Sequence, residues 1–410
     1  MSQYFINQEV ARYTLATGES FFTASARMTK WFVPFWFFSA LLLYIWPGWA
    51  SAIGTTLYAL FGFGTHIAWA RAALMIVLVL TFSGRVAYHV LERSLKVMVP
   101  TFFILLVIIS FYNLDAAIIT EALKGVVSFG FIPDNIDFSI LLGAVVFSGA
   151  GGMLNLCVGL WYRDKQNGMG EYAGRIMNPI TGRSEAIPAT GFIFPDTKES
   201  TRKWKGWMRY MFVDQGIIFL LVGFITLLLL SINAYAVLAP RGIVPEGLEI
   251  AVVQAHIFGE HWGPVGYDMF LAMAFLMLFS VMWTVIDALT RMTSDMLYTN
   301  ARVGPFMESL SRIRHYSLGR LYYTIITLVV VLGMIILPWK QPLVLLTISA
   351  VLGGLTMAIY VPILLYINNT HLPKHARPGL LTNIALGSAG IFYAGFSFII
   401  VYGEAANLFP

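Results

Sequence analysis

Residues 216–230 read GIIFLLVGFITLLLL, and this uncharged stretch lies within an apolar run that extends from 212 to 238. A bilayer core about 30 Å thick requires about 20 apolar residues in a helix, so the run is long enough to cross a membrane. Similar runs lie near 31–62, 67–84, 97–113, 139–161, 268–290, 320–338, 343–367 and 380–402. We therefore predict nine transmembrane helices, together with a partial helix at 3–17 that polar residues interrupt.

The composition supports the same fold class. Hydrophobic residues make up 58% of the 410 residues and charged residues only 11%, whereas soluble domains carry about 25% charged residues. This excludes a soluble enzyme, a disordered chain and a disulfide-rich secreted scaffold. The net charge of +5 does not indicate nucleic-acid binding, because the basic residues concentrate in loops between the apolar runs. The sequence predicts an all-α polytopic membrane protein, with one domain over residues 1–410 that lies in a lipid bilayer.

The loop charges predict the direction of the chain, since Lys and Arg are enriched in cytoplasmic loops. If 31–62 crosses the membrane once, most of the 26 basic residues fall on one side. The largest loop on that side, 163–210, is then cytoplasmic. The helix at 3–17 must run inward with almost nothing before it, so we expect an N-terminally truncated chain. An amphipathic surface helix is the alternative, but Glu9 and Arg12 share a face with apolar residues and favour the bundle interior.

One predicted span contains an unusual cluster of glycines. The segment 147–156 reads FSGAGGMLNL, and Gly149, Gly151 and Gly152 each cost a helix about 1 kcal/mol relative to alanine. This pattern predicts a helix that unwinds within the membrane and frees backbone carbonyl groups to bind an ion or another substrate. An equally weighted alternative is that the glycines only allow neighbouring helices to pack closely.

Polar groups near these glycines supply candidate ligands. Asn155 offers an amide oxygen, and Met153 offers a thioether two residues earlier. Hard cations prefer oxygen ligands, whereas sulfur favours softer transition metals.

Two pairs of opposite charges fall within predicted helices. Asp287 and Arg291 have the i,i+4 spacing of a helical ion pair, and Glu9 and Arg12 have the i,i+3 spacing. Ionisable groups inside membranes often mark transport pathways. Asp287 and Arg291 lie near the cytoplasmic end of their span, which favours a structural role over a pathway role, and Glu9 with Arg12 allows the same interpretation.

Catalytic motifs are missing from the sequence. It contains no GxxxxGKS or GxxxxGKT phosphate-binding loop, no HExxH and no GxSxG. No set of paired polar catalytic groups occurs in the apolar runs. We therefore expect no enzyme activity and no cofactor, so that any metal ion would be a transported substrate.

Several segments resemble one family of transporters. The stretch GAGGMLNLCVGLWYRDKQNGMGEYAGRIMNP at 149–179, with TGFIF and RKWKGWMRY after it, resembles the sixth helix and following loop of Nramp-related divalent metal transporters, in a divergent bacterial branch. QYFINQEVARYTLATGE at the start resembles the second helix of that family. GTTLYALFG, SGRVAYHVLERSLKVM and YVPILLYINN resemble its third helix, its fourth-to-fifth connection and its tenth helix. The similarity covers essentially the whole chain and is most specific in the sixth helix.

The resemblance implies a LeuT-type fold of the APC superfamily, with inverted five-helix repeats and alternating access, from which the first helix and part of the second are missing. The family's sixth helix contributes a carbonyl, a methionine and a histidine to the metal site. These map onto Ala150, Met153 and Asn155, so the histidine is replaced here. Gly48 and Ser51 occupy the positions of two acidic residues of the family's proton pathway, which weakens the case for proton coupling.

These observations together predict a secondary transporter. Its substrate would be a divalent cation of the Mn, Fe or Mg class, its location the inner membrane of a bacterium, and its oligomeric state stays open. One alternative is an amino-acid or organic-solute permease of the same fold. Another is a membrane scaffold subunit that transports nothing.

Overall fold

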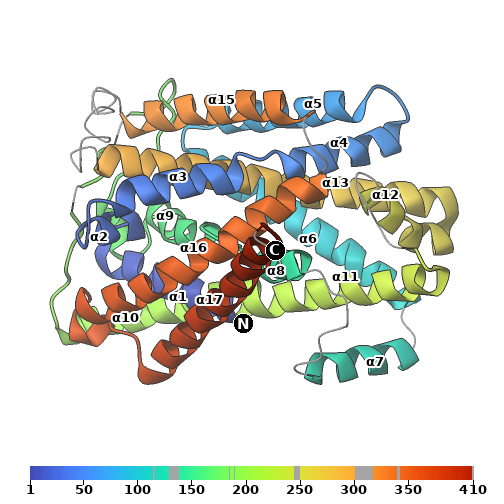
Figure 1. The fold of residues 1–410 in the computed structure, drawn as a ribbon. Coiled ribbons are helices and arrows are strands. Elements are labelled where there is room, and N and C mark those ends of the chain that lie inside the picture. The colour runs from blue at the N-terminus through green and yellow to red at the C-terminus, as the bar shows by residue number, and fades with distance from the viewer. Residues whose placement is uncertain are drawn as a thin grey trace.

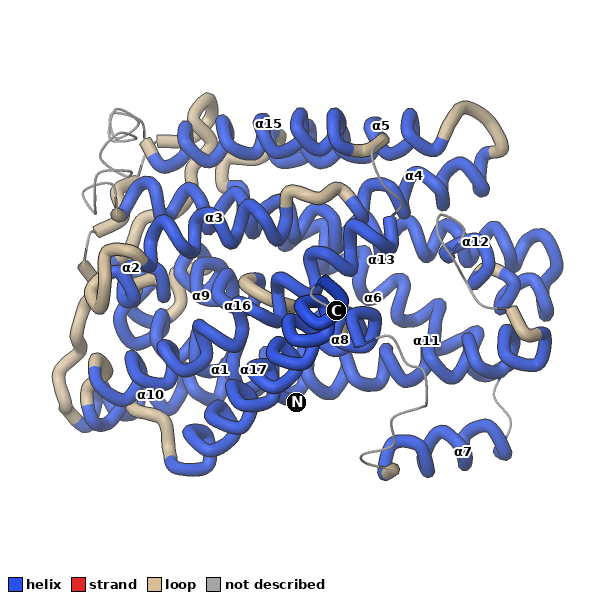
Figure 2. Tube along the Cα trace, viewed as in Figure 1, coloured by secondary structure: helices blue, strands red, loops and turns tan. Residues whose placement is uncertain are grey.

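The computed structural model describes residues 1–113, 116–128, 138–183, 185–188, 190–243, 250–300, 317–338 and 342–408. Throughout these ranges the regular secondary structure is helical, and most of the long helices run along one common direction (Figures 1 and 2). Within the described residues, seven helices are long and apolar enough to cross a membrane: Phe32–Phe61, Tyr88–Phe111, Lys198–Ala236, Trp262–Thr299, Leu318–Ile336, Leu346–Thr370 and Leu380–Ile400. These apolar helices confirm the prediction of a polytopic helical membrane protein, which is the fold class and not the detailed fold.

Two of the nine predicted spans are not among these seven long apolar helices. The run near 67–84 forms α5 (His66–Phe82), which is apolar but only 17 residues long. The run near 139–161 is divided into α8 (Phe138–Phe147) and α9 (Leu154–Asp164).

Several of the remaining named helices contain the seven candidate spans. These remaining helices are α1 (Ser2–Thr17), α2 (Phe21–Ala26), α3 (Phe32–Tyr44), α4 (Gly48–Phe61), α6 (Ala87–Asn113), α7 (Ala116–Val127), η1 (Gly168–Tyr172), α10 (Lys198–Met211), the π-helix η2 (Phe212–Val222), α11 (Gly223–Leu238), η3 (Ala239–Arg241), α12 (Ile250–Gln254), α13 (His256–Thr299), α15 (Leu318–Ile336), α16 (Pro342–Thr370), η6 (Lys374–Ala376) and α17 (Leu380–Leu408).

Helices α3 and α4 correspond to the predicted span 31–62. The chain leaves helical geometry between them, just before Gly48, where Pro47 has no backbone N–H to donate to a continuing helix. The two helices follow one another across the bundle (Figure 1). This arrangement agrees with one crossing rather than two.

Helix α1 lies inside the bundle, where it packs against α9, α16 and α17. Glu9 and Arg12 are both buried, and their Oε1 and Nε atoms are 2.8 Å apart. Asn368 of α16 donates from Nδ2 to Glu9 Oε2 at 2.7 Å. An amphipathic surface helix would expose these groups. The predicted position of α1 inside the bundle is therefore confirmed.

The predicted cytoplasmic loop 163–210 needs correction at both ends. Arg163 and Asp164 belong to α9 and are each only 1% exposed, and the segment from Lys198 onward is α10. The intervening loop packs on the end of α1. The N–H of Phe192 donates to Thr17 O at 2.8 Å, and a side chain at Gly168 would come within 2.5 Å of a backbone oxygen of α1.

Candidate functional site

The helix break predicted at the glycine cluster is present. Helix α8 ends at Phe147 and α9 begins at Leu154, and between them Gly151 and Gly152 have φ angles of 74° and 53°. This left-handed conformation costs other L-residues about 1–2 kcal/mol each, whereas glycine adopts it freely. The glycines therefore permit the break itself.

The same glycines also permit close packing. A Cβ atom on Gly152 would lie 2.9 Å from the Cα of Gly353 in α16, and one on Gly149 would lie 2.4 Å from Oε1 of Gln3. The break and the close packing therefore depend on the same few glycines, and substrate binding by the freed carbonyl groups stays a prediction.

Side chains from other helices pair with the backbone that the break exposes. Gln3 of α1 donates from Nε2 to Val146 O at 2.8 Å and accepts at Oε1 from Gly151 N at 2.9 Å. The hydroxyl of Tyr44 donates to Gly151 O and accepts from Leu154 N, both at 2.9 Å.

On the other side of the break, the hydroxyl of Tyr360 in α16 donates to Gly152 O at 2.9 Å. Unpaired backbone groups are costly inside a membrane, so α1, α3 and α16 stabilise the interruption through these contacts. Sequence reasoning did not identify Gln3, Tyr44 or Tyr360. The signal available in the sequence was that each of these residues carries a polar atom among apolar neighbours.

The predicted ligand residues lie at this break. Asn155 is fully buried, and its Nδ2 donates to the Tyr360 hydroxyl at 2.9 Å. Its Oδ1 is also buried and has no hydrogen-bond partner in the described part of the chain. Leaving a buried acceptor unpaired costs about 1–3 kcal/mol, so this oxygen is the atom of the site best suited to receive a ligand.

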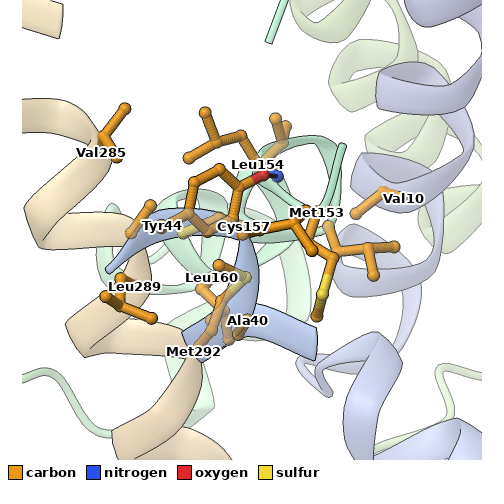
Figure 3. Packing of buried hydrophobic residues seen from close by; sticks show 14 of the residues in the cluster. Val10, Ala40, Tyr44, Met153, Leu154, Cys157, Leu160, Val285, Leu289 and Met292 are labelled. Atoms are coloured by element: carbon orange, nitrogen blue, oxygen red, sulfur yellow. Dashed lines mark hydrogen bonds between the residues drawn. The ribbon is translucent and has the colours of Figure 1, made fainter. Parts of the chain in front are cut away.

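The other two predicted ligands differ in their surroundings. Met153 is fully buried in an apolar cluster with Val10, Leu154 and Cys157 (Figure 3). Ala150 is half-buried in the break itself. The three positions therefore share one interrupted segment, but Met153 packs as part of the core.

A buried charged network lies on α9 and α13 beyond the break. The predicted pair is present, with Arg291 Nη2 2.8 Å from Asp287 Oδ1, and Arg291 also pairs with Asp164. Arg163 Nη1 lies 2.7 Å from Asp295 Oδ1. All five residues are at most 1% exposed. Three carboxylates and two guanidinium groups leave one net negative charge when all are ionised.

Two neutral groups also donate hydrogen bonds to the carboxylate of Asp287. Trp161 Nε1 donates to Oδ2 at 2.8 Å, and the Tyr322 hydroxyl donates to Oδ1 at 2.5 Å. This dense pairing supports the structural role that the spacing of Asp287 and Arg291 favoured. Sequence reasoning missed Arg163 and Asp164 because they were assigned to a loop.

A metal site built from charged ligands is not present in the part of the chain that the structure describes, since no three His, Cys, Asp or Glu side chains gather there in a way that could hold an ion. A cation at the break would meet amide, carbonyl and hydroxyl groups instead, since the thioether of Met153 packs in the apolar core.

Comparison of the chain with protein-family models and with curated proteins finds no match. Function must therefore be inferred from the geometry of the break and its surroundings.

Proposed function

We propose that this protein is a secondary transporter that moves a divalent metal cation of the Mn, Fe or Mg class across the inner membrane of a bacterium. The substrate would bind at the interruption between α8 and α9, in a LeuT-type fold related to the Nramp transporters. The observation that carries this proposal is the buried, unpaired Oδ1 of Asn155 beside a helix that glycines interrupt.

The chemistry of the break suits a cation better than an anion. Asn155 Oδ1 and the carbonyl oxygens of Gly151 and Gly152 all present negative partial charge. Tyr44 and Tyr360 donate hydrogen bonds to these carbonyls, so an entering cation can replace hydroxyl donors that rotate away. When its five groups are ionised, the network further along α9 carries one net negative charge, which favours a cation at the break.

The packing of the two half-helices supports alternating access. Helix α8 packs against α16, whereas α9 packs against α1 and α13. Gly151 and Gly152 form a joint between them in a conformation that other residues adopt poorly. A movement of one half-helix relative to the other would have to break the hydrogen bonds from Gln3 to Val146 O and from Asn368 to Glu9, and the substrate would stay at the joint between the half-helices.

An uptake assay tests the proposal. The purified protein is reconstituted into vesicles that contain a metal-sensitive dye, and Mn²⁺, Fe²⁺ and Mg²⁺ are added outside. Asn155→Leu should lower uptake about 10–100-fold, the range found for altered metal-site contacts. Asn369→Leu is the matched control, because this amide also lies on a membrane helix but pairs with Asn383 away from the break. It should leave uptake within about twofold of the unchanged protein.

Other results would identify the alternatives. Uptake of amino acids, with no effect of added metal ions, would assign the site to an organic-solute permease. A folded protein that transports none of these solutes would be a scaffold subunit and would overturn the proposal.

A further inference from the structure

Helix α10 carries a stripe of four basic residues, Lys198, Arg202, Lys205 and Arg209. Their spacing of four, three and four residues places them on one face of a helix. All four are exposed, whereas Trp204 on another face is buried against the bundle. The basic stripe therefore points away from the protein.

No ion pair within the described part of the chain neutralises these charges. None of the four has an ion-pair partner among the described residues. The neighbouring Lys203 differs, because its Nζ lies 2.9 Å from Oε1 of Glu199. A surface groove of about 720 Å³ follows the stripe, and Asp196 at its beginning is the one acidic residue among its described lining residues.

The stripe lies at the start of a candidate membrane helix. Helix α10 continues through η2 into α11, which gives the 39-residue candidate span Lys198–Ala236, whose apolar part is η2 and α11. At about 1.5 Å per residue this is nearly 60 Å, about twice the thickness of the hydrocarbon core. Phe212 and Val213 follow Arg209 after two intervening residues and are 57% and 43% exposed. The apolar surface thus begins where the basic stripe ends.

We propose that this stripe is a binding site for the headgroup of an anionic phospholipid. The lipid phosphate would lie against Arg202 and Lys205, and its acyl chains would extend along the apolar surface that begins at Phe212. Guanidinium groups bind phosphate oxygens through paired, charge-assisted hydrogen bonds. Basic clusters next to a membrane helix on the cytoplasmic side attract anionic lipids, and loop charges predict that side for α10. This site is separate from the helix break and does not depend on the transported substrate.

Lipid retention measured by native mass spectrometry tests the site. The detergent-solubilised protein is mixed with equal amounts of phosphatidylglycerol and phosphatidylcholine, and the bound lipids are counted. The unchanged protein should retain phosphatidylglycerol preferentially. Lys205→Gln should lower that preference about fivefold, and Arg202→Gln with Lys205→Gln should lower it about 25-fold.

The control is Lys203→Gln, which removes an exposed charge from the same helix but from a different face and should change the preference less than twofold. An equal effect of Lys203→Gln and Lys205→Gln would overturn the proposal, as would equal retention of both lipids by the unchanged protein. In a third measurement, millimolar inorganic phosphate is added to the protein with its bound lipid. Complete displacement of the lipid by phosphate would assign the stripe to a soluble anion instead.

Discussion

Replacement of Arg291 by methionine is expected to lower the free energy of unfolding by about 3–5 kcal/mol. Arg291 pairs with both Asp164 and Asp287, and all three side chains are essentially inaccessible to water. Methionine preserves much of the packing volume but leaves two buried carboxylates without their shared cation. The cost therefore arises from uncompensated charge rather than from a cavity.

Unfolding in mixed micelles of increasing SDS content, followed by tryptophan fluorescence, measures this change. Arg320→Met is the control, since Arg320 is exposed near the start of α15 and its loss should cost less than about 1 kcal/mol. Addition of Asp164→Asn to Arg291→Met should recover part of the stability, because it removes one of the unpaired charges. A cost below 1 kcal/mol for Arg291→Met would show that the network is not charged as described.

The second large effect is expected at Gly152. Gly152→Ala should destabilise the protein by about 3 kcal/mol, from backbone strain of about 1–2 kcal/mol and a steric clash of similar size. The new Cβ would lie 2.9 Å from the Cα of Gly353 and 3.0 Å from the Tyr44 hydroxyl oxygen. Backbone at Gly353 cannot move aside as a flexible side chain would.

Gly143→Ala provides the comparison in the same interrupted helix. Its nearest neighbour would be the Cβ of Ala350 at 3.6 Å, an ordinary contact. Because alanine is the better helix former, this variant should be neutral or more stable by up to about 1 kcal/mol. The same SDS unfolding experiment measures both variants. Equal stability of the two would mean that the left-handed turn at Gly152 is not required.

The sequence was sufficient for features that depend on local composition. Apolar length predicted the seven candidate membrane helices of the described chain, because the bilayer sets a minimum length for each crossing. It also predicted spans near 67–84 and 139–161, which form one shorter helix and two half-helices. Glycine content predicted the break at 149–152, because each glycine costs a helix about 1 kcal/mol relative to alanine. The pair Asp287 and Arg291 followed from spacing along one helix.

Features that depend on distant segments could not be predicted in the same way. Gln3 and Tyr360 approach the break from positions far away in the chain, and no local pattern indicates where a side chain from another helix will point. Asp164 was placed in a loop because buried charges are rare, and its burial depends on Arg291, which is 127 residues away. Helix α10 did have a local signal, since Thr197 accepts from Ser200 N as its N-cap.

The central claim, that the break between α8 and α9 opens to water and holds the substrate, can be tested by thiol labelling at Ala150. Cys157 is the chain's single cysteine, so Cys157→Ala with Ala150→Cys places one thiol in the break. A charged, membrane-impermeant methanethiosulfonate reagent should label it in reconstituted vesicles, and Mn²⁺ should slow the labelling several-fold. Lys203→Cys, at an exposed position on α10, is the positive control and should be labelled at the same rate with or without Mn²⁺. If the thiol at position 150 reacts from neither side of the membrane until the protein is denatured, while the control is labelled, the break is dry packing and the account is contradicted.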